Sequence, residues 1–291
     1  MNRPLRICVV YPDLLGTYGD GGNGVILARR AQWRGDEVEL VQAPSDAPLP
    51  EADLYCLGGG EDGPQVRAAR SLIDDGTLAR RTAGGAVVLA VCAGYQIVGT
   101  TFPGADGVPH EGVGLLEVAT TKGADARAVG EVVAEVVAES GLASLPTLTG
   151  FENHGGRTAL DGAASGAGTG AGVGAAGVAG VGPAAAGLAG PTDPTVPLAR
   201  VIAGVGNGDG SGREGAVCGR VLGTYLHGPL LARNPALADL LLAWALGLEV
   251  GELPPLDDTA AEGLRRERIA AMGRRRRTGR PRGSRGSRGS R

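Results

Sequence analysis

Cys92 is the residue of this 291-residue chain best placed for nucleophilic chemistry. Six apolar residues, Ala86–Val91, precede it and predict a buried parallel strand. The small residues Ala93 and Gly94 follow, and the pattern then turns helical. A nucleophile on a tight strand-to-helix turn needs small neighbours, and N–H groups at the start of the helix would favour a thiolate and bind an oxyanion. A free cysteine is also commonly a small buried hydrophobe, so the pattern alone leaves both interpretations open.

A cysteine nucleophile needs a base, and the chain offers three histidines. His110 lies in a Pro/Gly-rich loop soon after Cys92, whereas His154 and His227 each follow a strand-like segment. His227 ends an apolar segment at the sheet edge where Cys92 is expected, so we predict His227 as the base. A structural histidine held by hydrogen bonds is the competing interpretation.

Glycines follow two of the expected strands. Gly58–Gly60 come at the carboxyl end of a strand, where ligands bind in open α/β sheets, although a plain turn is the simpler interpretation. The earlier loop Pro12–Gly24 is also glycine-rich, but no Gly-Lys-Ser/Thr follows it, so it is no P-loop. We expect a long turn in which Asp20 or Asn23 caps the next helix.

Alternating strand and helix patterns predict an α/β fold with a doubly wound, mostly parallel sheet and a Cys nucleophile elbow. Strands are expected at 5–11, 37–42, 52–57, 86–91 and 217–225, and helices at 25–33, 65–73, 77–82, 234–246 and 264–268. The glutamates of 129–139 would allow a helix, but its β-branched valines favour a strand, and ordered structure returns at 198–204. We expect one domain over residues 1–272. It is interrupted at about 162–197 by a Gly/Ala-rich insertion too poor in large side chains to fold, and an Arg-rich disordered tail follows at 273–291.

Charge and cysteine content exclude several classes of protein. The net charge is −3, yet the segment after Met272 holds nine arginines and no acid, so the remaining residues are strongly acidic and give no case for nucleic-acid binding. The four cysteines show no zinc-ligand spacing. We see no signal peptide and no apolar run that could span a bilayer, and expect a cytoplasmic protein with free thiols.

Several blocks together resemble a known family. Cys92–Gln96 (Cys-Ala-Gly-Tyr-Gln) resembles the C-x-G-x-Q elbow of class I glutamine amidotransferases. Tyr11–Asp20, Gly150–Thr158 and Gly223–Pro229 look like the cobyric-acid-synthase (CobB/CobQ) type and, within it, like the glutaminase subunits of lipid II isoglutaminyl synthases. The resemblance covers residues 5–272 except the insertion.

The resemblance implies that Cys92 attacks the side-chain amide of L-glutamine while His227 relays protons. Standard triads of this family have an acid two residues after the histidine, but Pro229 stands there. The site is therefore expected to be a Cys–His dyad or to take its acid from elsewhere in the chain.

Substrate-binding residues also follow from the resemblance. Gly59, Gly60 and Ala93 would supply the N–H groups that hold the oxyanion, and Gln96 would help hold the substrate amide. Arg127 would bind the glutamine α-carboxylate, a role that suits the paired donors of a guanidinium group.

We recognise no ATP site in the sequence. The resemblance therefore implies a heterodimer with a Mur-ligase-like synthetase subunit (MurT), in which ATP and Mg are expected, and no cofactor in this chain. Two other functions remain open: a glutaminase subunit of another amidotransferase, such as a cobyric-acid-type synthase, and a non-catalytic scaffold of the same fold.

Overall fold

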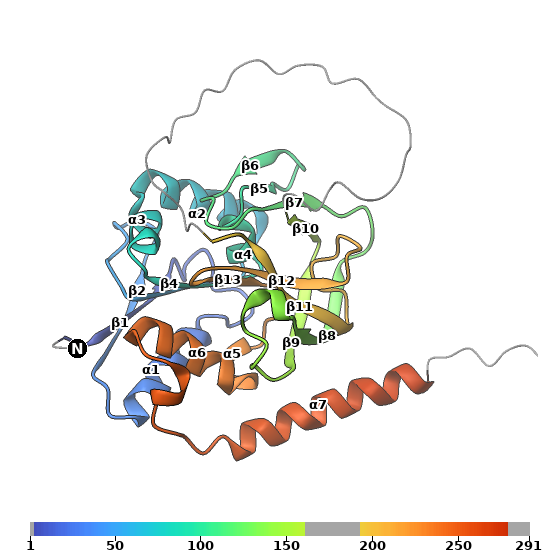
Figure 1. Cartoon of the computed structure of the whole chain (residues 1–291). Helices are drawn as coiled ribbons and strands as arrows, with labels where there is room; N and C mark the ends of the chain where they lie inside the picture. Colours follow the sequence, from blue (N-terminus) through green and yellow to red (C-terminus); the bar gives the residue numbers. More distant parts are fainter. Residues whose placement is uncertain (1–2, 161–192, 279–291) are drawn as a thin grey trace, which may run out of the picture.

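The computed structural model describes residues 3–160 and 193–278, which are built around a nine-stranded sheet in the order β2-β1-β3-β4-β13-β12-β11-β8-β9 (Figure 1). A second sheet has the order β10-β7-β5-β6. The strands are β1 (Leu5–Val10), β2 (Val38–Ala43), β3 (Leu54–Leu57), β4 (Val87–Val91), β5 (Thr101–Pro103), β6 (Pro109–Glu111), β7 (Val118–Lys122), β8 (Ala128–Val136), β9 (Leu148–His154), β10 (Gly156–Leu160), β11 (Val196–Ala203), β12 (Arg213–Cys218) and β13 (Val221–Thr224).

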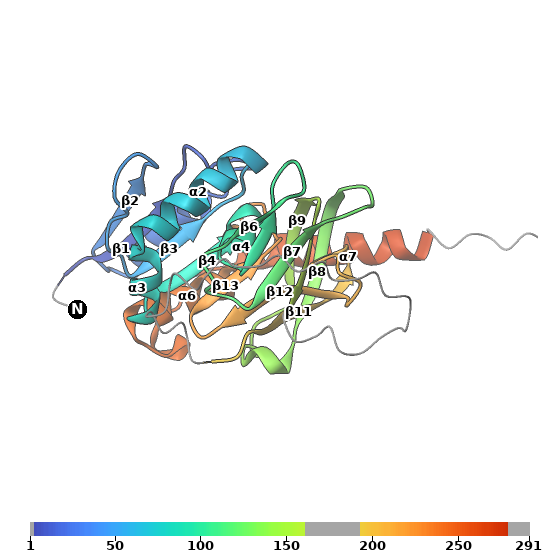
Figure 2. The same cartoon turned by 90° about the horizontal axis from the view of Figure 1, so that it is seen from above.

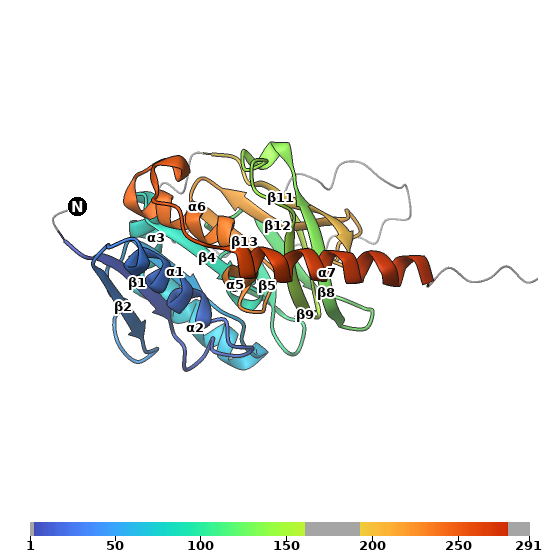
Figure 3. The same ribbon diagram turned by 90° about the horizontal axis from the view of Figure 1, so that it is seen from below.

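Helices cover both faces of the large sheet, as expected for a doubly wound fold (Figures 1 and 3). One face carries α1 (Gly22–Trp33), α5 (Leu230–Arg233) and α6 (Pro235–Leu246). The other carries α2 (Asp62–Asp75), α3 (Thr77–Ala83) and α4 (Ala93–Ile97), with the small sheet beside α4. Because both faces are covered, the central strand β4 is buried at all five positions, which explains its continuous apolar sequence.

The doubly wound sheet is confirmed, but its two halves differ in direction. Pairing is parallel from β2 through β13 and antiparallel from β13 through β9. The single strand predicted at 217–225 is wrong, because β12 and β13 form a hairpin there. Gly219 has φ +53° in the two-residue turn between them, a backbone conformation that suits glycine.

The two segments predicted to be unstructured lie mostly outside the described residues. The insertion was expected to end at 197, yet β11 begins at Val196 and Pro197 pairs with Ala216. The tail was expected from 273, yet α7 (Thr259–Thr278) continues through its first six residues and projects beyond the sheets (Figure 2). No helix within the described ranges is long and apolar enough to cross a membrane.

Candidate active site

Cys92 lies on a strained turn between β4 and α4. Its backbone has φ +54° and ψ −107°, which non-glycine residues rarely adopt and which is stabilised only where the surroundings enforce it. The Gly94 N–H donates to the Gly58 carbonyl at 3.0 Å, and a Cβ at Gly94 would lie 2.7 Å from the Leu57 Cβ. The small residues after Cys92 are therefore needed for close contact with β3, as the sequence indicated.

His227 follows β13 and is fixed at both its backbone and its ring. Its backbone pairs with Phe151 of β9 through hydrogen bonds of 2.8 and 3.2 Å. Its Nδ1 lies 2.8 Å from Oδ2 of Asp20, while Nε2 has no hydrogen-bond partner among the described residues. Burial would lower the pKa of His227, but the hydrogen bond to Asp20 and the negative charge available on Asp20 and on nearby Cys92 raise it to about 10.

Asp20 completes a Cys–His–Asp arrangement that the sequence prediction left without its acid. The residue comes from the glycine-rich loop before α1 and is 2% exposed. The prediction that Asp20 or Asn23 caps α1 is wrong, since the N-cap position is Gly21 and has no side-chain cap. The Asn23 Oδ1 instead accepts from the Leu231 N–H at 3.0 Å. In the sequence, Asp20 was visible only as a candidate helix cap and as part of a block quoted for the resemblance.

In the glycine loop after β3, Gly59 contacts Asp20 and Gly60 lines a cavity. The Gly59 N–H donates to Oδ2 of Asp20 at 3.0 Å, so the proposed oxyanion role of Gly59 is replaced by a bond to the acid. Gly60 and Ala93 line the cavity beside Cys92, and their N–H groups remain the proposed oxyanion donors.

A polar cavity of about 230 Å³ opens at Cys92. It brings together five of the seven predicted site residues, leaving out Gly59 and His227. Its lining residues are Gly60, Asp62, Gln65, Cys92, Ala93, Gln96, Pro103, Gly104, Lys122, Gly123, Asp125, Arg127, His154, Gly155 and Gly156.

Gln96 is held in the cavity wall by both ends of its amide. Its Oε1 accepts from Gln65 Nε2 at 2.8 Å, and its Nε2 donates to the Tyr225 hydroxyl at 3.0 Å. The backbone of Gly156 passes so close that a Cβ there would lie 2.6 Å from Gln96 Nε2. The amide is thus fixed in orientation before any ligand binds.

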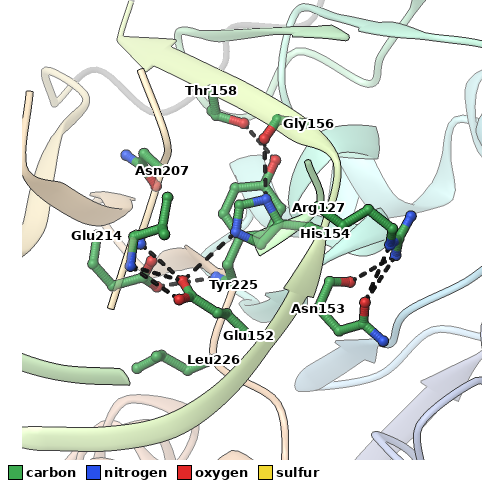
Figure 4. Close-up of polar contacts among 12 residues, drawn as sticks. Arg127, Glu152, Asn153, His154, Gly156, Thr158, Asn207, Glu214, Tyr225 and Leu226 are labelled. Carbon is green, nitrogen blue, oxygen red and sulfur yellow. Dashed lines mark hydrogen bonds and ion pairs between the residues drawn. The ribbon is translucent and has the colours of Figure 1, made fainter. Parts of the chain in front are cut away.

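Arg127 precedes β8 and lies at the edge of the same cavity, where its exposed guanidinium group donates to Asn153 (Figure 4). Of the other histidines, His110 packs near Phe102 on the small sheet, with ring centroids 5.9 Å apart. His154 lines the cavity, and its Nδ1–H donates to the Gly156 carbonyl at 3.0 Å. His227 differs from both in that its ring makes a hydrogen bond to a buried carboxylate, that of Asp20.

Comparisons with known proteins agree with this geometry. The CobB/CobQ-like glutamine amidotransferase domain matches residues 6–180. The chain belongs to the CobB/CobQ-like glutamine amidotransferase family. Subunit GatD of the glutamine-hydrolyzing lipid II isoglutaminyl synthase of Staphylococcus aureus is 32% identical, with 79% of each chain covered. The Streptococcus pneumoniae GatD is 30% identical, with 90% of each chain covered.

A cobyric acid synthase of Sphingopyxis alaskensis is also similar, at 33% identity over 71% of this chain but only 34% of the synthase. Among the described residues, no group of three or more His, Cys, Asp or Glu side chains is placed to hold a metal ion.

Proposed function

We propose that this chain is the glutaminase subunit of a lipid II isoglutaminyl synthase. The observation that carries the proposal is the Cys92–His227–Asp20 arrangement beside a polar cavity, in a chain that matches two GatD subunits over most of their length. The match to a cobyric acid synthase covers about a third of that protein, which favours the GatD assignment over a cobyric-acid-type synthase.

The geometry supports a two-step hydrolysis. Cys92 transfers its thiol proton to His227, and its Sγ attacks the side-chain carbonyl carbon of glutamine while the N–H groups of Gly60 and Ala93 hold the oxygen that becomes negative. His227, kept protonated by Asp20, gives its proton to the departing nitrogen, so ammonia leaves and a thioester forms. His227 then takes a proton from water, which attacks the thioester and releases glutamate.

The cavity offers complementary charges for the two ends of an amino acid. Arg127 is the proposed partner of the α-carboxylate. Asp62 and Asp125 line the same cavity and are the anions available to the α-ammonium group. Gln96, already oriented by Gln65, contacts the side-chain amide in this proposal.

We further propose that the ammonia passes to a Mur-ligase-like partner, MurT. The partner uses ATP to activate the D-glutamate α-carboxylate of lipid II, and the product is D-isoglutamine. The cavity contains no feature specific to lipid II, so the acceptor rests on the similarity to GatD alone.

Cys92→Ser in the assembled complex tests the proposal. The hydroxyl has a far higher pKa than the thiol, so we expect glutamine-driven amidation of lipid II to fall by several orders of magnitude. Amidation driven by added ammonium should persist, because free ammonia bypasses the glutaminase. Near-normal glutamine-driven activity would refute Cys92 as nucleophile, and loss of both activities in an intact complex would assign Cys92 to the synthetase step.

A further inference from the structure

Two adjacent residues at the end of β9, Asn153 and His154, contact different parts of the cavity wall (Figure 4). Neighbouring side chains of a strand point to opposite faces, so each can hold a different partner. The reaction proposed above uses neither residue. Both belong to a sequence block that the resemblance singled out without assigning a role.

Asn153 holds the guanidinium group of Arg127 on two sides. Arg127 Nε and Nη2 donate to Asn153 Oδ1 at 3.2 and 3.1 Å, and Nη2 also donates to the Asn153 carbonyl at 3.0 Å. The register of β8 and β9 pairs Val129 with Asn153, which places Arg127 beside its partner. An exposed arginine loses considerable rotamer freedom when it binds a ligand, and these hydrogen bonds impose that loss beforehand.

His154 holds a different side chain, Tyr225. The two rings stack with centroids 3.7 Å apart and 14° between their planes. His154 Nδ1 lies 3.0 Å from the Gly156 carbonyl, which makes Nδ1 the donor. The Tyr225 hydroxyl accepts from Gln96 Nε2 and is 2.6 Å from Thr158 Oγ1. The ring of His154 therefore fixes the tyrosine that orients the Gln96 amide.

The start of the same segment is anchored in the protein interior. Glu152 is 2% exposed, and its carboxylate accepts from the N–H groups of Val205 and Gly206. One residue earlier, Phe151 pairs with the backbone of His227. A single strand end thus contacts the catalytic base, the guanidinium group and the tyrosine behind Gln96.

We propose that Asn153 and His154 are positioning residues of the glutamine site: Asn153 presents Arg127 to the α-carboxylate, and His154 holds Tyr225 and through it the Gln96 amide. This inference rests on the proposed glutaminase function. It adds that glutamine affinity depends on two residues that do not themselves need to touch the substrate.

Asn153→Ala tests the first half, in the assembled complex with ammonia release as the readout. We expect the KM for glutamine to rise about tenfold with kcat nearly unchanged, because ground-state and transition-state binding of the carboxylate weaken equally. In an Arg127→Ala background the same change should have little further effect, since Asn153 acts only through Arg127. Val129→Ala, an exposed change on the paired strand, is the matched control and should leave KM unchanged.

His154 is tested with two variants. His154→Ala removes the stacked ring and should raise KM, whereas His154→Phe keeps a flat ring on Tyr225 and should restore KM toward the wild-type value. In a Tyr225→Phe background, which lacks the hydroxyl that holds Gln96, His154→Ala should add little. Thermal melting identifies variants that fail to fold. If His154→Ala does not fold, the KM of His154→Phe still decides, because a KM well above the wild-type value would contradict the role of the stacked ring.

The outcomes separate this inference from the proposed function. If Arg127→Ala leaves KM unchanged, the assigned carboxylate site itself is wrong. If Arg127→Ala raises KM while Asn153→Ala does not, only the positioning role of Asn153 is overturned. The positioning role of Asn153 is also overturned if Asn153→Ala raises KM by the same factor in the Arg127→Ala background as in the wild type. Iodoacetamide, which has no α-carboxylate, should alkylate Cys92 at the wild-type rate in the Asn153 variant, and slower alkylation would show a general distortion of the site instead.

Discussion

Replacing Asp20 with asparagine tests the feature of the site that sequence inspection did not find. Asn keeps the size of the side chain and removes its charge. One buried oxygen, Oδ2 of Asp20, faces both His227 Nδ1 at 2.8 Å and the Gly59 N–H at 3.0 Å. Hydrogen bonds to a charged group contribute about 1.5–3 kcal/mol each, against about 1 kcal/mol for neutral pairs. Replacing the two charged hydrogen bonds by neutral ones therefore costs on the order of 1.4–2.8 kcal/mol in total. Since about 1.4 kcal/mol corresponds to a factor of ten, we expect kcat for glutamine hydrolysis to fall about 10- to 100-fold.

The same substitution should change the pH profile in a defined direction. The pKa of His227 is raised to about 10, so the ring keeps its proton below that pH and loses it above. Asp20 contributes two of the causes that raise it, and without the carboxylate the pKa falls toward 6.5. We therefore expect the alkaline limb of kcat to move to lower pH, measured as ammonia release between about pH 6 and pH 10.

The control lies in the same loop. Asp13 is exposed and pairs with Ser45, so Asp13→Asn should leave both kcat and the pH profile unchanged. If Asp20→Asn keeps the wild-type kcat and alkaline limb, Asp20 does not orient the base and the site is a Cys–His dyad.

Two further predictions concern stability and the insertion. Burial raises the pKa of Glu214 from 4.5 to about 7, although hydrogen bonds from Thr224 and Tyr225 oppose the rise. Between pH 4.5 and pH 7 the folded state therefore binds more protons than the unfolded state, and the free energy of unfolding falls as pH rises. Glu214→Gln should abolish that fall, giving a higher Tm than the wild type at pH 8 and a similar Tm below pH 4.5, by calorimetry. Replacing residues 162–192, chosen for their Gly/Ala-rich composition, with a short Gly/Ser linker should leave glutaminase activity unchanged, because loop-closure cost varies slowly with length; a large drop in Tm would contradict this.

The strand-to-helix turn at Cys92 could be predicted from the sequence because its determinants are local. A continuous apolar strand, a cysteine and two small residues specify the elbow within nine positions, and the close contact of Gly94 with Leu57 explains why the small residue is required. The place of His227 was also predictable, since it follows an apolar segment, β13, that pairs with the strand preceding Cys92. The parallel half of the sheet follows from alternation of strands and helices, which is again a local signal.

The acid was not predictable because the contact is long-range. Asp20 and His227 are 207 positions apart, and a glycine-rich loop gives no periodic signal that marks one carboxylate as buried. The resemblance assigned the Gly59 N–H to the oxyanion, whereas that N–H donates to Asp20, which is also distant in the sequence. The hairpin of β12 and β13 was predicted as one strand, because its turn is only two residues long. The positive φ of Gly219 reverses the chain there, and the apolar pattern of the sequence does not reveal it.

Pro229 stands where the resemblance led us to expect an acid, and it lies close to the segment that carries Asp20. A Cβ at Gly22 would come within 2.9 Å of Pro229 Cγ, so the proline packs closely on the loop that holds Asp20. That loop is further tied to the oxyanion segment, because Thr17 N donates to Gly59 O at 3.2 Å and Asp20 accepts from Gly59 N. Position 229 thus holds a proline packed against the start of α1, and the carboxylate beside His227 comes from Asp20, 207 positions earlier in the chain.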